Sequence, residues 1–297
     1  MPHPYATEAY ASSLSHIGRP VAVPEWGCYL LARPIDAGGE DLLGCYPLAV
    51  LAPGADLRSG LVRLQSEGFV SITLAIDDIH RASISDLSAA FERLRPFKTH
   101  YVHCGGLQNY KPSKQHQYKI NRAYRTVLTK PISLKPYLPA WQEMYTGVVE
   151  RHQMSALHRF SGESFAELAE LPGVQAIGGF VDGNLVSCHI WIVNDGHVHS
   201  HLVASNEIGY AHRAAYAVND ASVRHFSDSA IVNFGGGAGL GDAEDGLVQF
   251  KKGFSNSQRP SYICGTILDH AAYKDLTTKT NGHSEDDSYF PAYRKRT

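Results

Sequence analysis

The 297-residue sequence lacks the features that would assign it to a membrane, secreted or disulfide-rich class. It has no apolar run near the ~18–20 residues of a membrane span, and its start, MPHPYATEAYASSL, has no basic segment followed by an apolar core. Its five cysteines are scattered, odd in number and without C-x-x-C spacing, which argues against a disulfide framework. Its 43% hydrophobic and 19% charged residues are ordinary for a soluble enzyme. We therefore expect a cytoplasmic protein with reduced thiols and no membrane partner.

A complete nucleotide-binding motif is also absent, although the glycine-rich run NFGGGAGLGDAE comes close to two of them. A phosphate loop needs a lysine after its last glycine, and Asp242 stands there instead. The dinucleotide fingerprint G-x-G-x-x-G fails because Leu240 or Asp242 occupies its last position. We expect the run to link a strand to a helix that has Asp242 or Asp245 as its N-cap. In that helix Phe250 lies on the apolar face and Lys251 points elsewhere; an ordinary connection with solvated lysines is the alternative.

Acidic residues are missing from a long central stretch, from Arg93 to Gln142, which contains ten lysines and arginines. Its densest part predicts a helix that starts at Ser113 and ends before Pro131. One side of this helix is cationic, and the other side is apolar. The cationic side holds Lys114, Tyr118, Lys119, Arg122 and Arg125. A face of one sign favours an anionic partner such as a phosphate, a coenzyme or tRNA, whereas simple solvation of the face is the alternative.

Strand-like and helix-like segments alternate along the chain, which favours an α/β fold. We predict strands at 26–35, 42–52, 69–77, 98–106, 229–236 and 262–268, hairpin turns at 182–184 and 194–196, and helices at 84–97, 137–154, 162–173 and 208–226. Each half gives strands, then a helix, then a strand. We therefore expect two similar lobes, residues 1–130 ending in the basic helix and residues 131–297. The C-terminal tail, with its aromatic residues Tyr289, Phe290 and Tyr293, is expected to fold back on a lobe.

The second half resembles the C-terminal part of Fem-type (FemABX-like) transferases, which are tandem GNAT-like proteins. The matching pieces occur in order: PGVQAIGGFVDGNLVSCHIWI, HVHSHLVASNEIGYAHRAAYAV, NFGGG and DGLVQFKKGFS. The segment FKTHYVHCGGLQNYKPSKQHQYKINRAYR resembles the family's bridge between the lobes. The resemblance covers about residues 90 to 265 well, and the first 90 residues loosely. It implies two GNAT-like lobes with mixed sheets flanked by helices.

The resemblance also implies an aminoacyltransferase, which moves an aminoacyl group from aminoacyl-tRNA to an amine on a peptide, a cell-wall precursor or a natural-product intermediate. The family's FK pair matches Phe250 and Lys251, and the resemblance implies that the lysine stabilises the tetrahedral oxyanion. An ester is already activated, so no metal or other cofactor is expected, and the chain has no G-x-S-x-G motif. Lys114, Lys119, Arg122 and Arg125 are the candidate tRNA-binding residues. The candidate substrate-binding residues are Ser205, Asn233, Gly235 and Tyr216.

Two other functions stay open at this point. An acyl-CoA-dependent N-acyltransferase would use the same fold, but the Q/R-x-x-G-x-G/A signature of its pyrophosphate loop is not evident. A metal-binding module is suggested by HVHSHL, because strand alternation places His197, His199 and His201 on one face. In the transferase, His201 would instead help to deprotonate the incoming amine.

Overall fold

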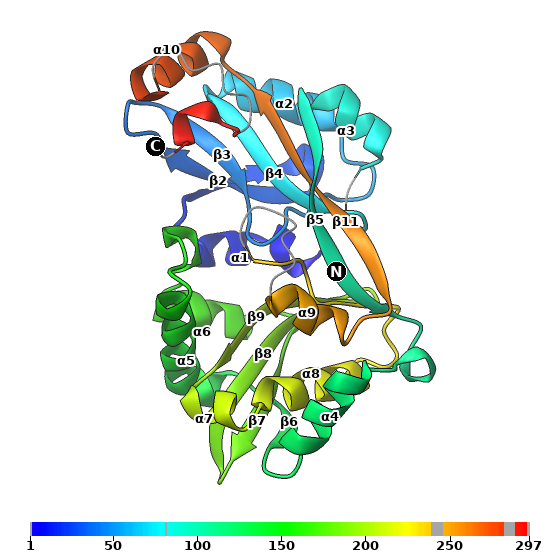
Figure 1. Ribbon diagram of the computed structural model, residues 1–297. Coiled ribbons are helices and arrows are strands. Elements are labelled where there is room, and N and C mark those ends of the chain that lie inside the picture. Colours follow the sequence, from blue (N-terminus) through cyan, green and yellow to red (C-terminus); the bar gives the residue numbers. More distant parts are fainter. Residues whose placement is uncertain (1, 81, 239–245, 282–288, 296–297) are drawn as a thin grey trace. The chain divides into compact units, whose positions relative to one another are not determined.

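The computed structural model describes residues 2–80, 82–238, 246–281 and 289–295 (Figure 1). The chain forms two compact units: unit 1 is Met1–Phe97 with Pro260–Thr297, and unit 2 is Lys98–Arg259. It passes between them in two long strands, β5 (Arg93–Cys104) and β11 (Ser257–Ile267). The division expected at residue 130 does not coincide with this one, because β11 carries the chain back into unit 1. The predicted α/β class is confirmed.

Unit 1 has a mixed sheet with the strand order β1-β2-β3-β4-β11. Its further strands are β1 (Arg19–Val23), β2 (Cys28–Pro34), β3 (Glu40–Gly44) and β4 (Ser71–Asp77). Only β3 and β4 pair in parallel among the pairs that the described residues form here. The helices are α1 (Glu8–Ser13), α2 (Leu57–Ser66), α3 (Ile84–Ala90) and α10 (His270–Asn281), with 3-10 turns at Pro4–Ala6, Pro24–Trp26 and Ala292–Arg294. The predicted helix at 84–97 is too long, because its last residues already belong to β5.

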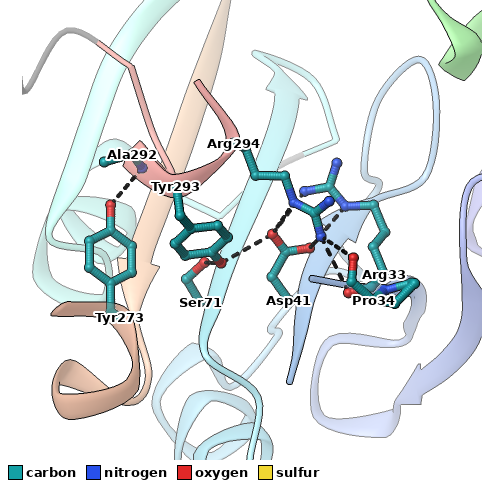
Figure 2. Close-up of polar contacts among 8 residues, drawn as sticks. All are labelled: Arg33, Pro34, Asp41, Ser71, Tyr273, Ala292, Tyr293 and Arg294. Atoms are coloured by element: carbon teal, nitrogen blue, oxygen red, sulfur yellow. Dashed lines mark hydrogen bonds and ion pairs between the residues drawn. The ribbon is translucent and has the colours of Figure 1, made fainter. Parts of the chain in front are cut away.

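The C-terminal segment packs on unit 1 through a buried carboxylate (Figure 2). Asp41, which has no exposed surface, accepts hydrogen bonds from Arg294 Nε at 2.8 Å and Arg33 Nε at 3.0 Å. The Tyr293 hydroxyl donates to Asp41 at 3.1 Å and lies 2.7 Å from the Ser71 hydroxyl. Burial, followed by the charge of Asp41, raises the pKa of Tyr293. The tail therefore supplies both an apolar ring and a cation to the interior of unit 1.

Unit 2 has the strand order β5-β10-β9-β8-β7-β6. Its further strands are β6 (Leu128–Ile132), β7 (Val174–Val181), β8 (Asn184–Asn194), β9 (His197–Ser205) and β10 (Ile231–Asn233). The helices are α4 (Lys114–Ala123), α5 (Leu138–Arg151), α6 (Gly162–Glu170), α7 (Glu207–Ala211), α8 (Ala214–His225) and α9 (Gly246–Lys252), with 3-10 turns at Leu107–Asn109, Lys135–Tyr137 and Ala156–His158. In Figure 1, α4 and α8 lie side by side on one face of this sheet, and α5 and α6 pack together against it.

A side-chain cap and a backbone reversal decide where two of these helices begin. The predicted start of the basic helix is confirmed, because the Ser113 hydroxyl accepts from His116 N at 3.3 Å. The helix predicted over 208–226 is instead two helices, since Arg213 has a left-handed backbone (φ 57°) between α7 and α8. The N-cap predicted for α9, Asp242 or Asp245, lies outside the described residues.

Candidate active site

The glycine run begins where two parallel strands of unit 2 separate. Strands β9 and β10 pair from His197↔Ile231 to His199↔Asn233. Strand β10 also pairs with β5, and after Asn233 this second pairing continues: Phe234 N donates to Tyr101 O at 2.9 Å, and Tyr101 N donates to Gly235 O at 3.1 Å. The second half of β9 therefore lies beyond its parallel pairing with β10.

Lys251 reaches back from α9 to this glycine run. Its ammonium donates to Gly236 O at 2.6 Å. The preceding turn needs glycine, because Gly235 has a φ of +74°. Asn233 Oδ1 fixes the turn by accepting from Gly235 N at 2.8 Å. Lys251 is thus a half-buried residue held at a loop, and the alternative of a fully solvated lysine does not describe it.

Lys98 on β5 approaches the same loop, and no sequence motif pointed to it. Its ammonium donates to Gly237 O at 3.0 Å. A Cβ on Gly236 would lie 3.0 Å from both Cβ and Cδ of Lys98, so a side chain there would press on the lysine stem. The glycines therefore let two ammonium groups reach consecutive carbonyls. The sequence feature that could have identified Lys98 is the alternation of side chains along β5. It places Lys98 on the same face of the strand as His100, which contacts Asn233.

Phe250 and Tyr216 form an aromatic contact that joins three helices of unit 2. Their ring centroids lie 4.9 Å apart, with the rings edge to face. His116 Nε2 lies 3.0 Å from Phe250 O, and Lys119 Nζ donates to the Tyr216 hydroxyl at 3.0 Å. A Cβ on Gly253 would lie within 2.2 Å of the His116 ring, which explains why glycine stands there. Phe250 thus holds α9, and with it Lys251, against α4 and α8.

The four predicted phosphate-binding cations do not share one environment. Lys114, Arg122 and Arg125 are exposed, and none of them has an ion pair within the ranges that the structure describes. Lys119 is half-buried, and its ammonium lies 4.9 Å from the centre of the Tyr216 ring. Lys119 therefore faces the aromatic contact, and the open cationic face consists of the other three.

His201 lies on β9, and its low pKa makes it a weak proton acceptor. Burial, with a smaller contribution from His199, lowers its pKa from 6.5 to about 3. A base of such low pKa holds a proton weakly at neutral pH, so burial does not favour the predicted role. Ser205 is also buried, and its hydroxyl donates to the Ser187 hydroxyl at 2.8 Å.

His189 on β8 is a second buried imidazole near the lysine site. Its pKa is lowered well below the ordinary value by burial and then by the positive charge of Lys251. His189 Nε2 lies 2.8 Å from the Ser200 hydroxyl. The neutral imidazole thus avoids adding a second positive charge beside Lys251.

The histidine alternation expected along β9 is interrupted. The pairing of β8 with β9 shifts by one residue between Ile190↔Leu202 and Trp191↔Ser200, so His201 is the extra residue of a bulge. Across the described part of the chain, no group of three or more His, Cys, Asp or Glu side chains is arranged to hold a metal ion. All five cysteines are free thiols.

No model of a known protein family matches this sequence, and no curated protein matches it. Several solved structures do match the fold. FemX superposes with a TM-score of 0.64 at 11% identity, over 92% of this chain and 95% of that chain. The C-terminal domain of a protein described as a lysylphosphatidylglycerol synthetase from Agrobacterium fabrum gives 0.61 at 13% identity, over 92% of each chain. L-PGS from Bacillus licheniformis gives 0.57 at 13% identity, over 95% of this chain and 98% of that chain.

At these identities the comparisons establish the fold. The predicted resemblance to the Fem-type, tandem GNAT-like fold is confirmed over 92% of this chain. Every helix that the structure describes is too short or too polar to cross a lipid bilayer.

Proposed function

We propose that the protein is an acyltransferase that moves an aminoacyl group from aminoacyl-tRNA to an amine and forms an amide bond. The observation that carries the proposal is the ammonium of Lys251, bonded at 2.6 Å to the glycine loop where β9 and β10 separate. The fold shared with FemX supports the reaction class. The lysine and the loop supply a fixed cation, which can stabilise the negative charge that develops on the carbonyl oxygen in an acyl transfer.

In this reaction the amine nitrogen attacks the ester carbonyl carbon. The carbonyl oxygen gains negative charge, and the ammonium of Lys251 stabilises that charge. The carbon–oxygen bond to the tRNA ribose then breaks, the amide remains, and the ribose oxygen takes up the proton that the amine loses. The hydrogen bond to Gly236 O orients the Lys251 ammonium at the glycine loop. Lys98 is proposed to hold the adjacent carbonyl, and so to position the same loop.

The exposed cations of α4 and of the turn that follows it are proposed to bind phosphates of the donor tRNA. Lys114, Arg122 and Arg125 offer positive charge to an anion because no carboxylate neutralises them within the described residues. Binding of a polyanion to such a face is favoured because it releases the counterions condensed on the polyanion. Lys119 is proposed to position the Tyr216–Phe250 contact rather than to bind a phosphate directly.

The test is a transfer assay with the full chain and two donors. Bulk tRNA charged with radiolabelled amino acids and labelled acetyl-CoA are each mixed with an acceptor panel of free amines, short peptides and phosphatidylglycerol vesicles. Phosphatidylglycerol is included because two matched structures carry the name of a lysylphosphatidylglycerol synthetase or its abbreviation. Transfer from tRNA to an amine supports the proposal, whereas transfer to a phosphatidylglycerol hydroxyl forms an ester and contradicts it. Transfer from acetyl-CoA alone, or from neither donor, contradicts it.

A further inference from the structure

The outward side of α4 carries an exposed aromatic ring among its cations. The Tyr118 side chain is 63% exposed, although a tyrosine usually buries most of its ring. Within the described residues it makes no hydrogen bond or ring contact. Fold stability therefore does not explain why an aromatic residue stands at this position.

Tyr118 lies in line with the cations that the helix exposes. Lys114, Tyr118 and Arg122 follow one another at four-residue spacing, so they occupy one face of the helix. This stripe is about 12 Å long, which matches three or four stacked nucleotides at about 3.4 Å each. The opposite face of α4 is closed, since His116, Ile120 and Ala123 are buried.

We propose that Tyr118 is a stacking residue for an unpaired base of RNA, with Lys114 and Arg122 binding the flanking phosphates. An aromatic ring with a free face binds any base by stacking, and adjacent cations hold the backbone on either side. An A-form duplex keeps its bases stacked on one another, so such a ring gains nothing from double-stranded RNA. The partner is thus the single-stranded part of a tRNA, an identification that rests on the proposed function.

An anionic membrane surface fits this face less well. A helix that lies on a membrane inserts a broad apolar face into the lipid. In α4 that face packs inside unit 2, and the outward side offers one aromatic ring between cations. The pattern of cation, ring and cation matches a strand of phosphates and bases better than it matches a lipid layer.

The experiment measures binding of the full chain to a fluorescein-labelled single-stranded RNA of about 8 nucleotides and to the corresponding RNA duplex. We expect Tyr118→Ala to weaken binding of the single strand by about 5- to 100-fold and to leave duplex binding nearly unchanged. Tyr118→Phe keeps the ring and is expected to retain binding. Tyr210→Ala is the matched control, because Tyr210 is 47% exposed but its ring is covered by the Arg151 guanidinium at 4.3 Å.

The proposal is overturned if neither RNA binds, if Tyr118→Ala weakens binding of both RNAs equally, or if Tyr118→Phe loses as much binding as Tyr118→Ala. Binding to phosphatidylglycerol vesicles without binding to RNA would overturn it in favour of a membrane surface. The binding assay needs no turnover, so its result is separate from that of the transfer assay. Stacking can hold even if no donor is consumed, and transfer can occur even if Tyr118 is dispensable.

Discussion

The role proposed for Lys251 makes a kinetic prediction, because the charge it meets is larger in the transition state than in the bound ester. We expect Lys251→Ala to lower kcat and kcat/KM together by about 100- to 1000-fold, the effect of losing one oxyanion donor. Lys251→Arg is expected to keep part of the activity, since the forked guanidinium cannot place its charge at the position of the compact ammonium. Steady-state kinetics with a charged tRNA donor give these values.

Lys252 is the control for that measurement. It is also half-buried on α9, but its ammonium lies 5.8 Å from the centre of the Tyr101 ring. Lys252→Ala is expected to have a much smaller effect on kcat. Equal effects of the two alanine variants, or a change in KM alone for Lys251→Ala, would contradict the oxyanion role.

The buried His201 predicts how stability depends on pH. Its pKa is 6.5 in the unfolded chain and about 3 in the folded chain, so the unfolded state binds more protons between these values. The free energy of unfolding is therefore greatest above pH 6.5 and falls as the pH drops toward 3, by up to about 1.4 kcal/mol per pH unit for this residue. Buried His189 adds to the fall in the same direction.

Urea unfolding at about pH 7.5 and about pH 5 measures that dependence. We expect His201→Gln to lose less stability than the parent between the two pH values, whatever its absolute stability. An identical loss in both proteins would show that His201 does not titrate as its burial requires.

At the scale of elements, the sequence predicted those parts whose signals are local. Ser113 caps α4 with its own hydroxyl, so the start of that helix is visible in the sequence. Helix α2 was missed because Gly60 weakens its helical pattern. The reason for this glycine is tertiary, since a Cβ there would lie 2.2 Å from Trp26 Nε1. Lys98 was missed for a similar reason: its partner, Gly237, is 139 positions away in sequence.

The exposed cations of α4 and of the turn after it predict a salt effect on donor binding. The double variant Arg122→Gln with Arg125→Gln is expected to weaken binding of tRNA. It should also reduce the slope of log K against log salt by about 0.7 to 0.9 for each phosphate that the protein no longer binds. Titrations of tRNA at several salt concentrations measure this slope. Lys119→Gln is the control variant. The Lys119 ammonium donates to the Tyr216 hydroxyl and not to a phosphate, so this substitution should leave the slope unchanged. A slope unaltered in the double variant would mean that the face is simply solvated.

At the scale of the whole molecule, the docked tail predicts a loss of stability confined to unit 1. Deleting residues 286–297 removes the buried Tyr293 ring and one of the two guanidinium groups on Asp41. We expect the free energy of unfolding of unit 1 to fall by about 3 kcal/mol or more and its melting temperature by about 10 °C. Calorimetry measures the shift, and any separate transition of unit 2 should stay in place.

An exposed ion pair of unit 1 supplies the control for the deletion. Arg19 and Glu40 are 2.8 Å apart with side chains 60% and 40% exposed, so Arg19→Gln is expected to change stability by less than about 1 kcal/mol. A melting curve unaltered by the deletion would contradict the docking of the tail.

The pairing of β4 with β11 sets an order for biosynthesis. Residues 71–77 pair with residues 261–267, so the ribosome must add about 180 residues before β4 meets its partner, which takes roughly 10 to 40 seconds. Unit 2 is one continuous stretch, 98–259, and is complete before that moment. A nascent chain therefore contains the whole of unit 2 while β4 still lacks its pairing with β11. The apolar residues Ile72, Leu74 and Ile76, which are buried in the folded protein, belong to this unpaired strand. Translation that stops before residue 260 leaves that edge open to other chains, and a chaperone would find its binding site there.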